Sequence, residues 1–159
     1  MRILGVDPGN NITGYGLIEK RMSGCFHIGS GQIKLAGKQV FSDRLKTIYG
    51  SLHGIIEDSR PDVLALEDIF YGKNIKSLIR QGHVRGVIIL AAAVVGMPVY
   101  EYTPLEIKKA VTGYGAAEKR QVQQMIKAIL NLPELPPPDA SDALAVAVCH
   151  SNFLKTVRL

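Results

Sequence analysis

Cysteine is scarce in this sequence: the 159 residues include only Cys25 and Cys149. The two stand far apart, and neither belongs to a Cys-x-x-Cys pair or lies near a histidine at the spacing of a zinc site. Two cysteines make no disulfide framework of the kind that supports small secreted domains. We therefore interpret both as free thiols, which excludes a disulfide-stapled scaffold.

Long apolar stretches are missing as well. The longest uncharged apolar run covers residues 86–100 and is interrupted by Gly96 and Pro98. A membrane-spanning helix needs about 20 such residues, so this run is typical of a buried core helix instead. Residues 1–7 have neither the apolar core nor the small-residue cleavage site of a signal peptide. These absences predict a soluble, cytoplasmic protein without a membrane segment.

Internal repeats and linkers are also absent. Hydrophobic residues make up 47% and charged residues 21% of the chain, as in ordinary globular proteins. This composition excludes a disordered tail, a collagen-like fibre and a coiled coil. The length excludes a protein that closes two full domains around a nucleotide. We predict a single domain that spans residues 1–159.

The distribution of apolar residues predicts strands and helices in a definite order. Short apolar or alternating runs, separated by Gly and Asn clusters, indicate a meander of three antiparallel strands. Further along, apolar residues recur every three or four positions, as in amphipathic helices. We predict strands at residues 2–7, 13–19, 25–33, 62–66 and 99–102, and helices at 40–58, 76–95, 118–130 and 139 to about 153, with a short helix that Thr103 caps and Pro104 begins.

This order is typical of an α/β protein. We expect one mixed sheet of five strands, in which an antiparallel meander precedes parallel strands, with helices on both faces. Gly82 and Gly86 share one face of the predicted helix 76–95. In a soluble protein such a pair indicates close helix packing, either within the chain or across a dimer.

The basic charge is localised. The formal net charge is +5, and residues 69–133 hold nine basic and only three acidic side chains. A basic region of this kind favours a polyanionic partner such as a nucleic-acid backbone. The alternative, that these side chains are only the solvated faces of amphipathic helices, remains open on charge alone.

Four carboxylates stand where a predicted strand ends or a predicted helix begins. Asp7 and Glu67 each follow an apolar strand, and Asp139 and Asp142 open the last helix at a spacing that places them on one face. None of the four has a Lys or Arg within three positions. Asp68 points to the other face of its strand if the strand continues, and we treat it as a surface residue.

Half-buried carboxylates that converge without counter-cations repel one another, unless a divalent metal neutralises them. Mg²⁺ prefers oxygen ligands, and a pair of such ions hydrolyses phosphodiesters. Structural alternatives stay open for three positions: Asp139 as a helix N-cap, Asp142 as a first-turn acid and Asp7 as a turn former. Glu67 is harder to explain structurally, because Glu is a poor strand residue.

Two aromatic residues, Phe70 and Tyr71, follow Glu67 in a polar, glycine-containing segment. Such positions are poor candidates for the core. Beside the carboxylates, these rings could stack on bases or wedge between them. The alternative is that Phe70 folds back into the core.

Five short motifs follow one another along the chain: Asp7-Pro8-Gly9, Thr13-Gly14-Tyr15-Gly16, Glu67 with Phe70 and Lys73-Asn74, Ala117-Glu118-Lys119, and Asp139-Ala140-Ser141-Asp142-Ala143-Leu144-Ala145. Each motif alone is weak. Over residues 2 to about 149, the ordered set closely resembles the RuvC family of bacterial Holliday-junction resolvases.

The resemblance implies a ribonuclease H-like fold and a homodimer that nicks two opposed strands of a four-way DNA junction symmetrically. The products would carry 5′-phosphate and 3′-hydroxyl ends. This junction resolution would serve homologous recombination and DNA repair. It further implies a Mg²⁺-dependent endonuclease with two ions per subunit, for which Mn²⁺ would substitute. Members usually work with a branch-migration motor, RuvA and RuvB.

The resemblance also carries over site residues. The metal-binding carboxylates would be Asp7, Glu67, Asp139 and Asp142, and Lys108 and Lys119 would hold or polarise the scissile phosphate. Phe70 would unstack DNA at the crossover. Together with the basic stretch, this predicts the following DNA-binding residues: Phe70, Tyr71, Lys73, Asn74, Lys76, Arg80, Lys108, Lys109, Lys119 and Arg120.

Two alternatives from other classes remain. A non-catalytic junction- or DNA-binding module would keep the basic stretch without needing the four carboxylates together. A ribonuclease H-like nuclease that processes RNA precursors would share the Asp7-containing opening motif but prefer RNA to branched DNA. Cleavage of four-way DNA junctions and of structured RNA distinguishes these alternatives.

Overall fold

The structure, a computed structural model, describes residues 1–35, 37–68 and 74–156. Within these ranges the predicted elements are confirmed, and their ends differ from the predicted ones by no more than three residues. The elements are β1 (Arg2–Asp7), β2 (Ile12–Arg21), β3 (Gly24–Lys34), α1 (Phe41–Ser59), β4 (Val63–Glu67), α2 (Ile75–Val94), β5 (Val99–Tyr102), α3 (Pro104–Thr112), α4 (Lys119–Ile129) and α5 (Pro138–Thr156).

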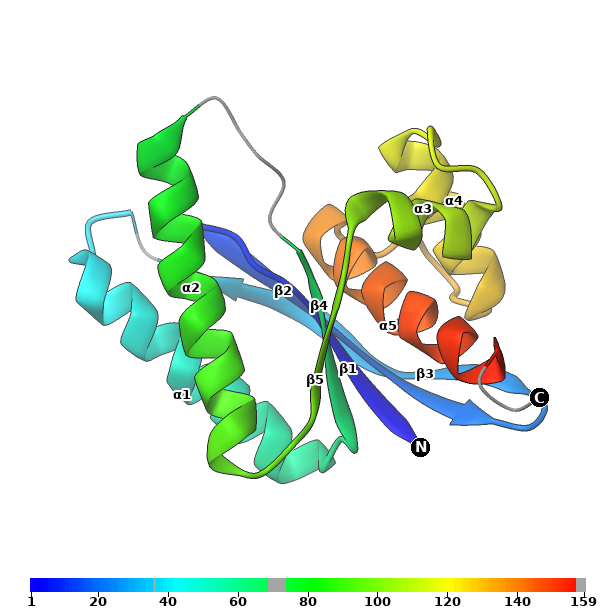
Figure 1. The fold of residues 1–159 in the computed structure, drawn as a ribbon, viewed down its shortest axis with the longest axis horizontal. Coiled ribbons are helices and arrows are strands. Elements are labelled where there is room, and N and C mark those ends of the chain that lie inside the picture. The colour runs from blue at the N-terminus through cyan, green and yellow to red at the C-terminus, as the bar shows by residue number, and fades with distance from the viewer. Residues whose placement is uncertain (36, 69–73, 157–159) are drawn as a thin grey trace.

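The strands form one mixed sheet in the order β3-β2-β1-β4-β5. β1, β2 and β3 pair antiparallel, whereas β4 pairs parallel to both β1 and β5. Helices α1 and α2 cover one face, and α3, α4 and α5 cover the other (Figure 1). The predicted α/β fold class is therefore confirmed, with the meander and the parallel strands where the sequence placed them.

Side-chain alternation in the strands builds two cores, one on each face. In β1, Ile3 belongs to the cluster beneath α5, whereas Leu4 and Val6 belong to the cluster beneath α1 and α2. In β4, Ala65 belongs to the cluster beneath α5 and Leu66 to the cluster beneath α1 and α2. Because successive side chains point to opposite faces, the last residue of each strand, Asp7 or Glu67, points to the α5 face.

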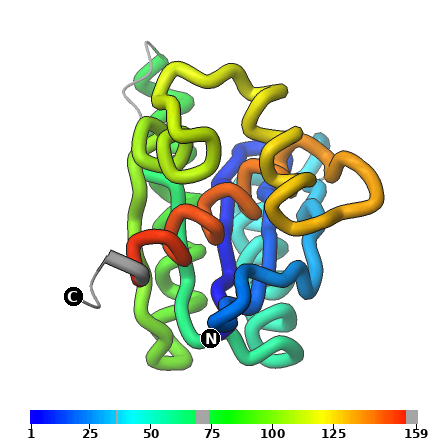
Figure 2. The backbone as a smooth tube through the Cα atoms, turned by 90° about the vertical axis from the view of Figure 1, so that its right-hand side faces the viewer, coloured from blue at the N-terminus to red at the C-terminus, as the bar shows by residue number. Residues whose placement is uncertain are grey.

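Helix α5 lies directly on β1 and β2 because glycines leave room for its backbone. A Cβ added at Gly5 would stand 2.0 Å from the carbonyl oxygen of Ala143, and one at Gly14 would stand 2.0 Å from that of Asp139. Figure 2 shows α5, in orange to red, crossing the strands on this face. The close approach lowers the first turn of α5 onto the sheet beside the end of β1.

Helix α2 is long and apolar enough to cross a membrane, by length and composition only, and core helices of soluble proteins pass the same test. One side of α2 buries Val84, Ile88 and Ala91. The apolar run 86–100, interpreted from the sequence as a core helix, forms only partly a helix. α2 ends at Val94, the chain turns at Gly96 with φ +70°, and the run continues into β5.

Candidate active site

The predicted carboxylates converge at one edge of the sheet. Asp7 and Glu67 end the neighbouring parallel strands β1 and β4, in which Val6 pairs with Leu66. Asp139 and Asp142 stand in the first turns of α5, above that edge. Adjacent parallel strands end side by side, and the side-chain alternation gives their last residues the same face. Local sequence pattern and sheet register together therefore gather four acids.

A cavity of about 230 Å³ opens beside these acids. Glu67 and Asp142 line it on the acidic side, and Lys108 and Lys119 contribute basic groups. Its apolar lining is supplied by Pro104, Ile107, Val122 and Ala145. The structure thus brings both lysines of the sequence prediction to the carboxylates, one from α3 and the other from the start of α4.

The electrostatics of the cluster centre on Asp7. Burial, and then the negative charges of Glu67 and Asp142, raise the pKa of Asp7 from 3.8 to about 7. Burial also raises the pKa of Glu67, and a hydrogen bond from the Asp7 side chain opposes that rise. Two carboxyl groups share such a bond only when one is protonated, and the raised pKa makes Asp7 the proton carrier below about pH 7. A positive charge entering the cluster would release it.

Asp142 has a counter-cation that the local sequence did not reveal. Lys119 Nζ lies 2.6 Å from Asp142 Oδ2. This hydrogen bond raises the pKa of Lys119, and it opposes the larger effect of burial, which raises the pKa of Asp142. The expectation that all four acids lack a basic partner is therefore wrong for Asp142, because the lysine comes from α4 rather than from the flanking residues.

Asp139 is not the N-cap of the last helix. Helix α5 begins one residue earlier, at Pro138, a residue favoured at the first helical position. The Asp139 side chain instead accepts a hydrogen bond from Gln32 Nε2 in β3, at 2.7 Å to Oδ2. Sequence reasoning missed Gln32, because no local signal connects residues that are 107 positions apart.

The four acids suit a divalent cation by donor type and charge. Within the described ranges, however, no three His, Cys, Asp or Glu side chains meet in a geometry that could hold a metal. Lys119 supplies one positive charge to Asp142, whereas Asp7 remains subject to the repulsion of its acidic neighbours. The residues therefore fit Mg²⁺ by chemistry and place, but their side chains do not form a closed shell around one point.

Arg85 belongs to the interior of the molecule, contrary to the prediction from the charge pattern. It counted toward the basic region, yet it is only 6% exposed. Its guanidinium donates to the backbone carbonyl oxygen of Glu67, lies 2.5 Å from Glu101 Oε1 and lies 3.5 Å from Asp68 Oδ1. Arg85 thus fixes the end of β4 that carries Glu67. Its place in the apolar stripe of α2, between Val84 and Ile88, was the available signal.

The predicted DNA-binding residues fall into three groups. Phe70, Tyr71 and Lys73 lie outside the described residues. Lys76 and Arg80 are exposed on the first turns of α2, and the Arg80 guanidinium stands 5.7 Å from the centre of the Phe41 ring. Asn74, Lys108, Lys109, Lys119 and Arg120 complete the set.

Asn74 has a structural role, since its side chain accepts the backbone N–H of Ser77 and caps α2. Arg120 is exposed on α4, beside Lys119. Lys109 is exposed on α3 and lines a separate cavity with Phe153, rather than the cavity that Lys108 lines. The structure therefore brings Lys108 and Lys119, but not Lys109, to the acidic cluster.

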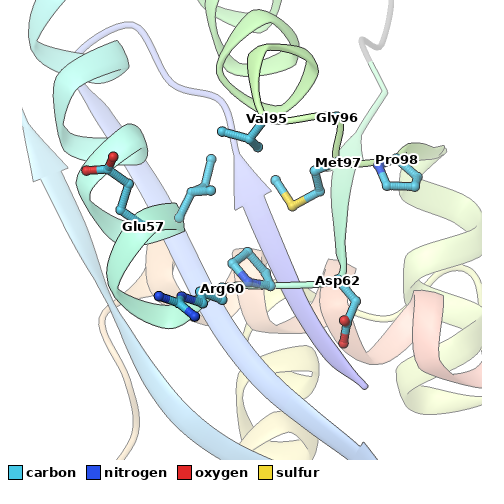
Figure 3. A pocket seen from close by; sticks show the side chains of 9 residues that line it. Glu57, Arg60, Asp62, Val95, Gly96, Met97 and Pro98 are labelled. Atoms are coloured by element: carbon cyan, nitrogen blue, oxygen red, sulfur yellow. The ribbon is translucent and has the colours of Figure 1, made fainter.

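A larger cavity, of about 490 Å³, lies at the opposite end of the sheet (Figure 3). Met97 and Pro61 line it, and Glu57, Arg60 and Asp62 carry its charges. Asp62 Oδ2 accepts the backbone N–H of Arg2 at 2.7 Å, which leaves this acid satisfied within the fold. Size alone does not make this cavity a catalytic site.

Comparisons with known proteins agree along nearly the whole chain. A family model described as crossover junction endodeoxyribonuclease RuvC matches residues 3–150. The proteins of that name from Syntrophotalea carbinolica and Geotalea uraniireducens are 53% and 52% identical over 152 residues. These alignments cover 96% of this chain in both cases, with 94% and 89% of the respective relatives.

A solved structure gives the same result in three dimensions. Thermus thermophilus RuvC in complex with Holliday junction substrate superimposes with a TM-score of 0.90 at 26% identity. The superposition covers 99% of this chain and 97% of that chain. The ribonuclease H-like arrangement of sheet and helices is therefore shared over the full length.

Proposed function

This chain belongs to the RuvC family of crossover junction endodeoxyribonucleases, and we propose that it resolves four-way DNA junctions by paired, symmetric nicks in homologous recombination and DNA repair. The relatives carry the name of that activity, and the Thermus thermophilus protein was solved with the junction. The observation that carries the proposal is the meeting of Asp7, Glu67, Asp139 and Asp142 at one sheet edge, beside two lysines.

Two divalent ions per subunit, Mg²⁺ with Mn²⁺ as a substitute, would be held by Asp7, Glu67, Asp139 and Asp142. When bound, such ions supply an activated water and stabilise the leaving oxygen of a phosphodiester. Asp7 would lose its proton as positive charge enters the cluster, since its pKa is raised by burial and by neighbouring negative charge. Cleavage would leave 5′-phosphate and 3′-hydroxyl ends.

The lysines would act on the phosphate itself. Lys119 is held at the cavity by its 2.6 Å contact with Asp142, and Lys108 lines the same cavity. An ammonium group beside a non-bridging oxygen stabilises the charge that develops there during attack. We therefore assign the strongest electrostatic contribution from a side chain to Lys119 and a positioning contribution to Lys108.

Symmetric nicking requires a homodimer, and the outer side of α2 is the surface we propose for it. Ile75, Ile79 and Leu90 on this helix are 71%, 56% and 53% exposed. A methyl group added at Gly82 or Gly86 would meet no atom of the described chain within 4 Å, apart from the adjacent residues and the nearby backbone of α2 itself. This favours packing across a dimer over packing within the chain, and the glycines would let two α2 helices approach closely. A two-fold dimer presents two equivalent sites to two equivalent strands.

The remaining assignments follow from the family. We propose that the protein acts in the cytoplasm, where it meets chromosomal DNA, and that RuvA and RuvB supply it with migrating junctions. The exposed basic residues Lys76, Arg80 and Arg120 would contact the phosphate backbone outside the cavity. Phe70, Tyr71 and Lys73 remain predicted junction contacts.

The test is cleavage of a labelled synthetic four-way junction in Mg²⁺, with T-rich and T-poor cores, together with a gel-shift assay in EDTA. Paired nicks at symmetric positions, with intact junction binding in EDTA, support the proposal. Tight binding without nicking in either Mg²⁺ or Mn²⁺ would leave a non-catalytic junction-binding module. Faster cleavage of structured RNA than of junction DNA would point to RNA processing.

A further inference from the structure

Gln32 lies in the same cross-strand row as Asp7, at the end of the sheet that carries the acidic cluster. In the strand pairing, Asp7 of β1 faces Gly14 of β2, and Gly14 faces Gln32 of β3. Directly paired residues in neighbouring strands present their side chains on the same face. Gln32 and Asp7 therefore flank Gly14 on the α5 face, although they belong to strands that do not touch.

Asp139 occupies the space above this row. A Cβ at Gly14 would lie 2.0 Å from the carbonyl oxygen of Asp139, so the absent side chain makes room for the first turn of α5. From there the Asp139 carboxylate accepts the Gln32 Nε2 hydrogen at 2.7 Å. The negative charge of Asp139 also contributes to raising the pKa values of Asp7 and Asp142. The Asp139 carboxylate thus binds Gln32 and also acts through its charge on Asp7 and Asp142.

A glutamine suits this place chemically. Its amide donates a hydrogen bond, which fixes the carboxylate, but it carries no charge, so it leaves the negative charge of Asp139 intact. A lysine or arginine would neutralise that charge. Without any donor, an aspartate in a first helical turn turns readily toward backbone N–H groups of its own helix.

We propose that Gln32 is a positioning residue: by holding Oδ2 of Asp139, it directs Oδ1 toward the cation site shared with Asp7 and Asp142 and raises the affinity of the cluster for a divalent metal. The inference rests on the proposed metal-dependent function. Groups that orient metal ligands through hydrogen bonds commonly contribute about 10-fold to 100-fold in metal affinity.

The first experiment measures Mn²⁺ binding by the full chain without DNA, by isothermal titration calorimetry. Gln32→Met keeps the length of the side chain and removes the donor, and we expect it to raise the Kd for Mn²⁺ about 10-fold. Gln124→Met, which removes an exposed glutamine of α4, is the matched control and leaves the Kd unchanged. An unchanged Kd for Gln32→Met would overturn the proposal.

A double-mutant cycle separates positioning from general damage. In an Asp139→Ala background, Gln32 has no carboxylate to orient, so Gln32→Met should change the Kd for Mn²⁺ less than about 2-fold. A full 10-fold effect in that background would show that Gln32 acts by another route and would overturn the inference. Melting temperatures in EDTA provide the folding control, and Gln32→Met should melt with the parent chain.

Cleavage kinetics test the role of Gln32 separately from the proposed metal-dependent function. In single-turnover junction cleavage, Gln32→Met should raise the Mn²⁺ concentration for half-maximal rate about 10-fold and leave the rate at saturating Mn²⁺ within about 3-fold. A lowered saturating rate with unchanged metal dependence would contradict positioning. If the parent chain itself neither binds Mn²⁺ nor cleaves, the proposed function fails. If the parent is active and the variant is identical to it, only the role of Gln32 fails.

Discussion

The two ends of the sheet both carry a cavity with acidic residues, yet they differ in how each charge is satisfied. At the end where β4 and β5 begin, Asp62 accepts the backbone N–H of Arg2, and the Arg2 guanidinium donates to the backbone oxygen of Ser59. At the other end, burial and the charge of Glu67 raise the pKa of Asp7, and burial raises the pKa of Glu67. The first arrangement connects β1 to the segment between α1 and β4. The second leaves the acids at Asp7 and Glu67 repelling each other.

The chemistry of the two cavities does not follow their size. The larger cavity, of about 490 Å³, lies at the satisfied end, and the smaller one, of about 230 Å³, lies beside the acids. Perturbed titratable groups with a named physical cause are better indicators of a reactive site than volume is. Substitutions at the two ends should therefore have unequal effects.

Asp7→Asn should reduce junction cleavage by about 1,000-fold or more, because a central oxygen ligand and its charge are lost. Junction binding in EDTA should stay within about 3-fold of the parent chain. Asp62→Asn at the opposite end is the matched control and should cleave within about 2-fold of the parent. Quantified nicking and gel shifts measure both, and equal losses in the two variants would refute the assignment of the two ends.

Lys119→Ala should slow cleavage at saturating Mg²⁺ by about 100-fold, since one preorganised donor to a developing charge is commonly worth that much. Lys127→Ala, on the same helix but outside the cavity lining, is the control and should retain the parent rate. Single-turnover kinetics on a pre-bound junction give the comparison. A Lys119→Ala effect confined to junction affinity would assign the lysine to binding alone.

Arg85→Met should lower the free energy of unfolding by about 1–3 kcal/mol, because it removes the buried guanidinium and leaves the Glu67 carbonyl without its donor. Glu101 and Asp68 are both nearly half exposed, so water would compensate much of their loss. Urea unfolding measures the change. Arg80→Met, at an exposed arginine of the same helix, should change stability by less than about 0.5 kcal/mol.

The acidic cluster should also give the protein a pH dependence of stability. The pKa of Asp7 is raised from 3.8 to about 7, so between these values the folded state binds its proton more tightly than the unfolded state does. Stability therefore falls as pH rises through this window. Asp7→Asn should raise the free energy of unfolding by about 1–3 kcal/mol at pH 8 in EDTA and change it little at pH 4. An equal gain at both pH values would contradict this cause.

The secondary structure was largely readable from the sequence because its causes are local. The apolar stripe of α1, the Thr103 cap with Pro104 and the alternating strands each act over a few residues, and the structure reproduces all of them. The N-cap interpretation of Asp139 failed by a single residue, since Pro138 already starts the helix. Helix ends depend on such small differences, and pattern alone does not decide them.

The candidate site was readable in part. Four acids at strand and helix ends, without basic residues nearby in the sequence, indicated a cluster. In an α/β fold, the residues that end neighbouring parallel strands lie close together at the same end of the sheet. Arg85 was misplaced among the surface charges, although its position in the apolar stripe of α2 was visible. The predicted contacts Phe70, Tyr71 and Lys73 lie outside the described residues.

Local sequence patterns set the order of strands and helices, the side-chain alternation that turns Asp7 and Glu67 to one face, and the acidic character of this end of the sheet. The partners that hold those acids depend on tertiary contacts. Lys119 reaches Asp142 from another helix, and Gln32 reaches Asp139 across 107 positions from an edge strand. The reason is physical: propensity and periodicity act between neighbours in the chain, whereas these contacts depend on sheet register and on how closely α5 settles on the glycines beneath it.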